Sequence, residues 1–279
     1  MNVINQVNET MTEPLAKNGK TASRPYARTE WPIYILSLEG EEERRAPLLS
    51  ALADMGLSAE VLIGVDGRKG LPERAEEQIL RQRLDPAKRP LTDGEYACAL
   101  SHVNAYRNIL DQDVRGAIIF EDDARIDDGF KTFVEARGYA LGDMVLLGHR
   151  RCWVSRFDNR KISPRLNLHR IAITPHLAHA YSVSSDAARA LLEAATPVRE
   201  PADWPCELSR MNVFAIEPQV AHQRTQDLGH SHLEADRLEL LSKYKPIKSQ
   251  GKWKRLIRKR SRHSWWRSWL MKRMNRRLS

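Results

Sequence analysis

Short apolar runs alternate with longer amphipathic segments from residue 31 onward. Residues 33–38 and 61–65 have the length and composition of strands, whereas residues 41–55 repeat apolar positions at helical spacing and end at Gly56. A strand, a helix and a second strand in this order predict a right-handed crossover between parallel strands. The pattern therefore predicts the α/β class, with a mostly parallel central sheet and helices on its faces.

The next helix has a well-marked beginning. Thr92 precedes it as an N-cap, Glu95 is placed to complete a capping box, and Leu91 and Tyr96 are spaced as a hydrophobic staple. We expect this helix to end near residue 110. Beyond it, the same periodicities predict strands at residues 117–120, 144–147 and 180–183, and helices at residues 127–137 and 185–195.

Three consecutive carboxylates, Glu121, Asp122 and Asp123, follow the strand that ends at residue 120. Adjacent acids repel one another, and a divalent cation such as Mg²⁺ or Mn²⁺ relieves that repulsion because it prefers hard oxygen ligands. The alternative is an acidic start of the next helix, in which Asp127 and Asp128 take part. Taken alone, the strand end is compatible with both a metal site and a helix start.

Composition places the chain among globular proteins, with 42% hydrophobic and 29% charged residues in 279. The net charge of +9 is unevenly distributed, because residues 243–279 hold 15 Lys and Arg and no acidic residue, which leaves −6 on the remainder. Residues 1–29 are polar without apolar periodicity and predict a disordered leader. The expected organisation is this leader, a domain over residues 30–241, and a basic, Trp-rich tail over residues 242–279.

Cys98, Cys152 and Cys206 are odd in number and widely separated. Their spacing argues against both a disulfide framework and a zinc site, and it fits a reducing compartment. The sequence contains neither an apolar signal core near its start nor a run of about 18 apolar residues. These features predict a cytoplasmic protein.

Six motifs occur in a fixed order along the chain. They are residues 33–38 with Arg45, residues 64–67 with Asp66, Glu95 to His102, Glu121-Asp122-Asp123, His179-Ala180-Tyr181, and Asp203 after Pro197 and Pro201. Together they resemble glycosyltransferase family 25, which includes bacterial lipopolysaccharide and lipooligosaccharide glycosyltransferases. Leu177 and Ala178, just before His179, depart from the Gly-Thr pair that the family tends to have there. Neither a GxGxxG nor a Walker loop occurs in the sequence, so a nucleotide is not held by the usual glycine cradle.

The resemblance implies a GT-A-like fold, a nucleotide-sugar donor such as UDP-galactose, and transfer with inversion at the anomeric carbon. It also implies a lipopolysaccharide or another cell-surface glycan as the acceptor. The donor-binding residues expected from the same motifs are Arg45, Asp66, Ser101, His102, Glu121 and Asp122.

The reaction itself restricts the roles of the acids. Transfer from a sugar nucleotide expels a diphosphate, and a bridging divalent metal, Mn²⁺ or Mg²⁺, stabilises its charge. Glu121 and Asp123 form an acid-x-acid pattern, with Asp123 the first choice of ligand. Inversion needs a base opposite the leaving group, for which Asp203 is the candidate and Glu207 the second choice. Asp203 can instead cap a helix over residues 204–211.

Other polar residues have two interpretations each. His222 is either a late metal ligand or a surface histidine. A loop with His149, Arg150, Arg151 and Arg156 either neutralises the diphosphate or is simply solvated. For the whole chain, the alternatives to a glycosyltransferase are a non-catalytic nucleic-acid or acidic-surface binding protein and a metal-dependent phosphohydrolase or nucleotidyltransferase.

The tail predicts a location. Arranged as a helix, residues 252–279 have one side with Trp253 and Leu256 and an opposite side with Lys254 and Arg255. Anionic lipid attracts each basic residue near its surface by about 1 kcal/mol. The tail therefore favours peripheral attachment to the inner face of a bacterial cytoplasmic membrane and a glycolipid acceptor. Nucleic-acid binding and a solvated tail are the alternatives.

Overall fold

The computed structural model describes residues 30–82, 88–224, 232–243, 272 and 275–278. The predicted leader and most of the predicted tail lie outside these residues. Among the described residues, none of the helices combines the length and apolar content that crossing a bilayer requires. The elements are β1 (Ile33–Ser37), α1 (Glu42–Asp54), β2 (Glu60–Ile63), α2 (Glu73–Glu76), α3 (Asp93–Asp111), β3 (Gly116–Glu121), β4 (Ala124–Ile126), α4 (Asp128–Glu135), the 3-10 turn η1 (Gly138–Ala140), β5 (Met144–Leu146), β6 (Trp153–Lys161), β7 (Asn167–Ile173), β8 (Ala180–Ser184), α5 (Ser185–Ala195), the 3-10 turn η2 (Leu208–Arg210), β9 (Val213–Glu217), β10 (Ala221–Gln223), α6 (His232–Lys243) and β11 (Arg276–Arg277).

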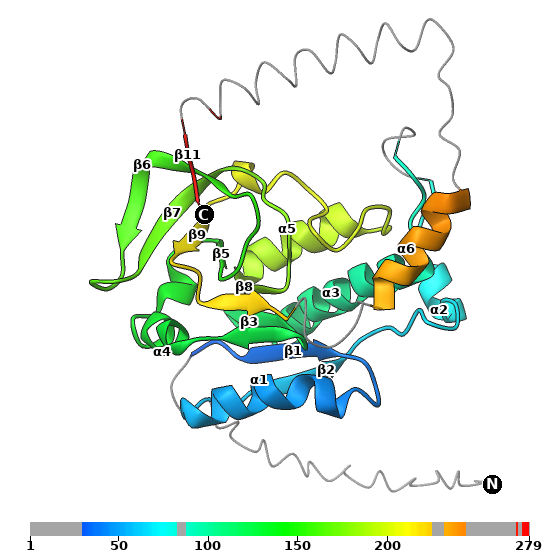
Figure 1. The fold of residues 1–279 in the computed structure, drawn as a ribbon, viewed down its shortest axis with the longest axis horizontal. Helices are drawn as coiled ribbons and strands as arrows, with labels where there is room; N and C mark the ends of the chain where they lie inside the picture. The colour runs from blue at the N-terminus through cyan, green and yellow to red at the C-terminus, as the bar shows by residue number, and fades with distance from the viewer. Residues whose placement is uncertain (1–29, 83–87, 225–231, 244–271, 273–274, 279) are drawn as a thin grey trace, which may run out of the picture.

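A nine-stranded sheet forms the centre of the molecule, in the order β11-β6-β7-β9-β5-β8-β3-β1-β2 (Figure 1). β1 pairs in parallel with β2 and β3, and β5 pairs in parallel with β9. The other neighbours are antiparallel, because β8 and the β6–β7 hairpin run against the strands beside them. The predicted α/β class and central sheet are confirmed, with a mixed sheet that is parallel around β1 and between β5 and β9.

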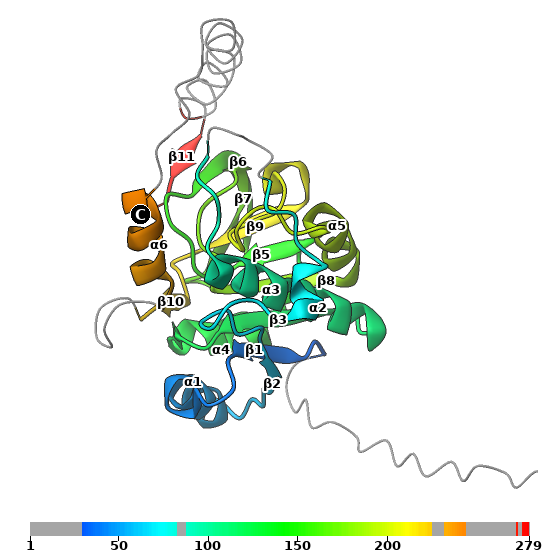
Figure 2. The ribbon, with the colours of Figure 1, turned by 90° about the vertical axis from the view of Figure 1, so that its right-hand side faces the viewer.

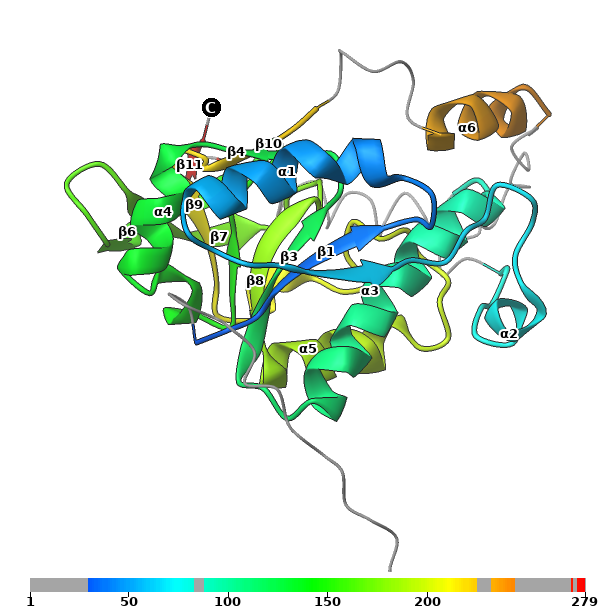
Figure 3. The ribbon, with the colours of Figure 1, turned by 90° about the horizontal axis from the view of Figure 1, so that it is seen from below.

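Helices cover both faces of this sheet (Figure 3). α1 and α4 pack on the face that carries Ile118 and Phe120, and α3 and α5 pack on the face that carries Ala117 and Ile119. Successive residues of a strand point to opposite faces, so a strand buried on both sides has to be apolar at every position. This is why residues 117–120 form an uninterrupted apolar run that predicts the strand clearly.

The start of α3 has the predicted capping box. The Oγ1 of Thr92 accepts a hydrogen bond from the N–H of Glu95 at 3.1 Å, and Glu95 Oε2 accepts one from the N–H of Thr92 at 3.0 Å. The buried carboxylate of Glu95 also accepts hydrogen bonds from Arg89 and, at 2.8 Å, from Arg237 of α6. The capping residue therefore also fastens α6 to the beginning of α3.

Residues 153–173 form a hairpin where the sequence predicted a loop. β6 and β7 pair in antiparallel fashion, and Arg156 lies within β6. Most side chains of β6 are exposed, and Phe157 is 90% exposed. Val154 is the one buried residue of β6, so the strand has no alternation of apolar and polar residues, and this explains why the pattern does not predict it.

The end of the chain returns to the sheet beside β6 (Figure 2). The N–H of Leu278 donates to the carbonyl of Cys152 at 2.9 Å, and Arg276 forms an ion pair with Glu217 at 2.6 Å. The side chain of Leu278 is 3% exposed and packs in the core on the α3 and α5 side of the sheet. The domain boundary predicted at residue 241 needs correction, because residues 276–278 belong to the sheet and core of the domain.

Candidate active site at the carboxyl end of β3

The three acids lie where several parallel strands end. β1 and β3 are parallel neighbours, with Leu36 opposite Glu121, so the residues that follow both strands meet at one edge of the sheet. Glu121 is the last residue of β3, and Asp122 and Asp123 come directly after it, both largely buried. α1 follows β1 and therefore starts at the same edge, where its Arg44 contacts Asp122 and Asp123.

Arg44, in the first turn of α1, holds two of the acids together. The Nε of its guanidinium group donates to Asp122 Oδ1 at 2.6 Å, and the Nη2 of the same group donates to Asp123 Oδ2 at 2.9 Å. The hydroxyl of Ser37 donates to Asp122 Oδ2 at 3.0 Å. The positive charge of Arg44 thus offsets the repulsion between the neighbouring carboxylates.

The sequence motif predicted Arg45, and not Arg44, as a donor-binding residue. Arg45 lies at the same edge, where its Nη1 donates to Ser37 Oγ at 3.2 Å and to the Leu38 carbonyl at 3.3 Å. Its other contact is an ion pair with Glu42 at 2.6 Å. Arg45 therefore shapes the end of β1, whereas its neighbour Arg44 reaches the acids.

Asp123 is the carboxylate that best fits a cation. Its Oδ2 accepts from Arg44 and, at 3.3 Å, from Gln223 of β10, but its buried Oδ1 has no hydrogen-bond partner among the residues that the structure describes. Burial and the neighbouring charge of Glu121 raise the pKa of Asp123 to about 6. Buried carboxylate oxygens with unused lone pairs suit Mg²⁺ or Mn²⁺, so the residues present fit the metal that the resemblance implies.

Glu121 belongs to a buried chain of hydrogen-bonding groups. Its Oε1 lies 3.3 Å from Nε2 of His102, whose Nδ1 lies 2.9 Å from the hydroxyl of Tyr181. That hydroxyl in turn donates to the hydroxyl of Tyr106 at 3.1 Å. Burial alone would raise the pKa of Glu121, but the hydrogen bond from His102 and the charge of Arg44 bring it below its usual value. The chain fixes the orientation of both Glu121 and His102.

Ser101 and Asp66 lie beside the end of β2. The Oγ of Ser101 donates to the carbonyl of Ala97 at 2.9 Å and accepts from the N–H of Val65 at 2.9 Å, so it ties α3 to the segment after β2. Asp66 is more exposed and is paired with Arg68 at 2.7 Å. The structure thus places Ser101 as a structural link, and it does not bring Asp66 into contact with the three acids.

Asp203 lies close enough to the acidic motif for the charge of Glu121 to affect its pKa. Its Oδ2 is 3.7 Å from Nδ1 of His176, and its side chain accepts a hydrogen bond from the backbone of Leu177. Partial burial and the charge of Glu121 raise its pKa despite His176. The predicted helix over residues 204–211 is wrong, since only the 3-10 turn η2 forms there, and Asp203 therefore does not cap an α-helix.

Glu207 is engaged in a local contact. Its Oε1 accepts from the N–H of Thr174 at 3.2 Å, from the Thr174 hydroxyl, and from the Ser209 hydroxyl at 3.0 Å. Although burial favours its neutral form, these hydrogen bonds lower the pKa of Glu207 below the usual value. A carboxylate with this many donors is a poor proton acceptor, and this favours Asp203 as the base.

His179 is a buried residue without a predicted role in the site. Its carbonyl accepts from the N–H of Glu121 at 2.8 Å, and its ring is neutral because burial lowers its pKa. A Cβ added to Gly148, at the end of β5, would overlap this ring, so the close approach requires glycine. His179 is thus held between Gly148 and the backbone of Glu121.

The remaining candidates lie at the periphery. His222 of β10 is exposed, and its Nε2 faces Asp127 at 3.5 Å, while its neighbour Gln223 reaches Asp123. An open groove of about 530 Å³ is bounded by the predicted basic loop and the end of the chain. Its lining residues are His149, Arg150, Arg151, Arg277 and Leu278.

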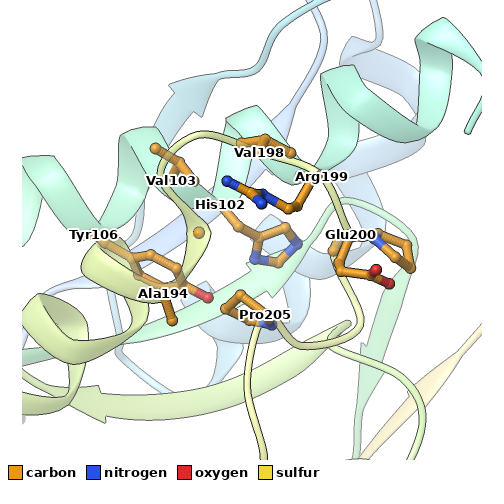
Figure 4. Close-up of a pocket in the computed structure, with 12 residues that line it drawn as sticks. His102, Val103, Tyr106, Ala194, Val198, Arg199, Glu200 and Pro205 are labelled. Carbon is orange, nitrogen blue, oxygen red and sulfur yellow. The ribbon is translucent and has the colours of Figure 1, made fainter. Parts of the chain in front are cut away.

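A small cavity of about 20 Å³ lies between α3, α5 and the segment before Asp203 (Figure 4). The imidazole of His102 points toward this segment, and Val103 and Tyr106 lie beside it on α3 (Figure 4). This volume holds about one water molecule and is too small for a sugar. The cavity separates His102 from the loop that carries the candidate base.

Comparison with known proteins agrees with the resemblance found in the sequence. The family model of glycosyltransferase family 25, described as LPS biosynthesis protein, matches residues 30–205, a segment that contains the acids, His102 and Asp203. The chain belongs to glycosyltransferase family 25. The match confirms the resemblance found in the sequence.

Individual members of the family align with parts of this chain. The probable inactive glycosyltransferase 25 family member 3 of Rattus norvegicus is 34% identical over 107 residues, which is 37% of this chain and 19% of the relative. Procollagen galactosyltransferase 1 of Danio rerio is 28% identical over 172 residues, 58% of this chain and 28% of the relative. A glycosyltransferase 25 family member of Aedes aegypti is 30% identical over 128 residues, 43% of this chain and 21% of the relative. The chain thus spans less than a third of the length of these relatives.

Proposed function

We propose that this protein transfers galactose from UDP-galactose to a hydroxyl of a lipopolysaccharide or another cell-surface glycan, with a divalent metal and with inversion. Family membership supports the transfer reaction, and the name of one relative, a procollagen galactosyltransferase, supports galactose. The observation that carries the proposal is the group of acids at the carboxyl end of β3, in which the buried Oδ1 of Asp123 has no partner among the described residues.

Asp123 and Glu121 are the residues that would hold Mn²⁺ or Mg²⁺. When bound, the metal stabilises the negative charge that develops on the departing diphosphate. Asp122 stays paired with Arg44 and Ser37, and this pairing keeps the three carboxylates close together. The His102 and Tyr181 hydrogen bonds hold Glu121 in place from behind.

Asp203 takes the proton of the acceptor hydroxyl in this proposal. It is half exposed, so an acceptor from solvent can reach it, and it lies in a segment separate from the metal-binding acids. Its raised pKa brings it nearer to neutral pH, where a general base is most effective. Attack from the side opposite the diphosphate inverts the configuration of the anomeric carbon.

We further propose that the basic tail attaches the enzyme to an anionic membrane surface where a glycolipid acceptor resides. The proposal rests on the 15 Lys and Arg residues within residues 243–279 and on the Trp residues among them.

A screen of nucleotide sugars with the full-length protein tests the reaction. We expect saturable binding and turnover of UDP-galactose with Mn²⁺, loss of turnover on chelation, and recovery when metal is added back. Asp123→Asn is expected to lower turnover by at least about 100-fold, because it removes a ligand charge from the metal site. Asp128→Asn, an exposed acid only five residues away, is the matched control and should behave as wild type.

Two results would contradict the proposal. Wild-type turnover by Asp123→Asn in the presence of manganese would remove the metal assignment. A product whose new linkage retains the configuration of the donor, measured by NMR, would remove the direct displacement and with it the need for Asp203 as a base.

A further inference from the structure

Three metal-binding side chains meet behind the acidic motif. Cys98 and His102 lie one turn apart on the same face of α3, and Glu121 comes from the end of β3. Their ligand atoms, the Sγ of Cys98, a ring nitrogen of His102 and a carboxylate oxygen of Glu121, all lie within 4.8 Å of one another. A helix and a strand distant in sequence thus place a thiol, an imidazole and a carboxylate around one point.

The separation of two of these atoms matches a tetrahedral metal site. Nε2 of His102 and Oε1 of Glu121 are 3.3 Å apart. Two ligands bound to Zn²⁺ at about 2.0–2.1 Å with a tetrahedral angle between them are separated by about 3.3 Å. The two groups therefore need little movement to bind one ion.

The surroundings of His102 are those of a metal ligand. Its Nδ1 is held by the Tyr181 hydroxyl at 2.9 Å, which leaves Nε2 directed at the site. The Tyr181 hydroxyl is itself held by Tyr106 at 3.1 Å. Hydrogen bonds of this kind to the second ring nitrogen orient a histidine ligand and raise its affinity for metal.

The donor set selects a different ion from that of Asp123. A thiolate and an imidazole favour Zn²⁺, whereas Mg²⁺ and Mn²⁺ prefer sites built from oxygen ligands. Three protein ligands leave a fourth position for water, as in zinc sites that stay open to solvent. The three residues therefore form a candidate site for a borderline-soft divalent cation, next to one for a hard cation.

We propose that Cys98, His102 and Glu121 bind one Zn²⁺ ion, and that this ion inhibits transfer. Binding forms a sulfur–zinc bond, and the proton of the Cys98 thiol passes to solvent. Because Glu121 is shared with the acidic motif, its coordination to Zn²⁺ withdraws it from the metal that serves the donor. The inhibitory part rests on the proposed function, whereas the binding part does not.

Cobalt is the probe for the binding part, because Co²⁺ takes the same ligands as Zn²⁺ and absorbs light when a thiolate binds it. The full-length protein is titrated with Co²⁺, and the thiolate-to-cobalt charge-transfer band is recorded. We expect one equivalent to saturate the band and Zn²⁺ to abolish it. Cys98→Ala should lose the band, whereas Cys206→Ala, a second half-buried cysteine, should keep it. Asp123→Asn should also keep it, which separates this site from the acidic motif.

A measurement on the wild-type protein covers the case in which Cys98→Ala does not fold. Alkylation of the native protein with iodoacetamide is followed by peptide mass spectrometry, with and without one equivalent of Zn²⁺. Zinc should slow the alkylation of Cys98 several-fold and leave that of Cys206 unchanged. Absence of the cobalt band, a band that survives Cys98→Ala, or equal protection of both cysteines would each overturn the site.

The inhibitory part has its own test. Zn²⁺ should inhibit turnover of the wild-type enzyme and of Cys206→Ala, and it should inhibit Cys98→Ala at least about 10-fold less strongly, because replacing one of three ligands removes most of the affinity. Cobalt binding without any turnover would overturn the proposed function alone. Equal zinc inhibition of wild type and Cys98→Ala would overturn the inhibitory role. The cobalt titration would still show whether Cys98, His102 and Glu121 bind a metal ion.

Discussion

At the scale of single residues, direction in space decides what the sequence leaves open. Arg44 and Arg45 have the same side chain, but consecutive residues of a helix point about 100° apart. Of these two arginines, Arg44 is the one that reaches Asp122 and Asp123. Leu177 stands where the family tends to have glycine, and its φ of +78° lies in the left-handed region that favours glycine. Its backbone still donates to Asp203. Neighbouring residues in the sequence therefore have separate roles.

Asp203→Asn is the residue-scale test of the base. We expect turnover to fall by about 100-fold or more with donor affinity nearly unchanged, because the amide cannot accept the acceptor's proton. In the wild-type enzyme, the acidic limb of the kcat/KM profile should lie above the usual pKa of aspartate, since burial raises the pKa of Asp203 and the base must be ionised. Equal losses of donor affinity and rate in Asp203→Asn would identify a positioning role.

Glu207→Gln should instead lower the thermal stability, because it weakens the contacts of this side chain with Thr174.

Glu95 connects stability to pH. Burial opposes its charge, but hydrogen bonds from Arg89, the N–H of Thr92 and Arg237 lower its pKa from 4.5 to about 2. A pKa lowered by folding stabilises the protein above the unfolded value, and that contribution disappears as pH falls through the folded value. Each pKa unit corresponds to about 1.4 kcal/mol, so the contribution is about 3 kcal/mol at neutral pH.

We therefore predict a pH-dependent effect of Glu95→Gln. Chemical denaturation at a series of pH values should show that the variant is less stable than wild type above about pH 5, and that the difference shrinks between pH 4.5 and 2. A difference that stays constant over this range would show that the charge of Glu95 is not what stabilises the junction of α3 and α6.

At the scale of elements, strands that are buried on both faces can be recognised from sequence, and strands at the edge cannot. β1 and β3 are uninterrupted apolar runs because helices cover both of their faces. β6 and β11 contain mainly polar residues, and their positions depend on backbone hydrogen bonds to a neighbouring strand. Such bonds are formed by any residue except proline, so side chains give little indication of them.

Leu278 tests whether β11 is part of the domain. Leu278→Ala should lower the free energy of unfolding by about 2 to 5 kcal/mol, because it removes a buried side chain from the core. Leu241→Ala, in α6, is the control: that side chain is 52% exposed, and its loss should change stability by less than about 0.5 kcal/mol. Urea denaturation measures both, and equal effects would mean that the chain end is not packed in the core.

At the scale of the whole molecule, the basic segment lies between two attachment points on the domain. Arg237 of α6 binds Glu95, and β11 pairs with β6, so residues 244–271 connect two fixed positions. Deleting everything after residue 243 would remove the proposed membrane contact and β11 together. A test of location therefore has to change the charges and leave residues 275–279 in place.

The matched variants change only residues 244–271. One replaces the ten Lys and Arg residues of this segment by Gln, and the other replaces its four Trp residues by Ala. The Gln variant should not sediment with vesicles of anionic lipid, because each basic residue near the surface contributes about 1 kcal/mol. The Trp variant should sediment at low salt and be released completely at high salt, while the wild type is released only in part.

Activity provides the control for these variants. Transfer to a soluble acceptor should be unchanged in both, which separates attachment from catalysis. Sedimentation of the Gln variant at the wild-type level, or a preference of the wild type for nucleic acid over lipid at physiological salt, would refute the proposed membrane attachment.

The sequence by itself determined the α/β class, the buried strands, the capping box of α3 and the family, because each depends on local periodicity or on residues in a fixed order. It also determined that Glu121, Asp122 and Asp123 follow a strand. Only the tertiary structure decided that Arg44 holds the acids, that Glu121 joins Cys98 and His102, and that the chain end returns to the sheet. Cysteine spacing did not indicate that Cys98 and His102 lie beside Glu121, because a residue supplied by another element leaves no trace in that spacing. Contacts between distant segments depend on how the elements pack, and the local pattern does not record that packing.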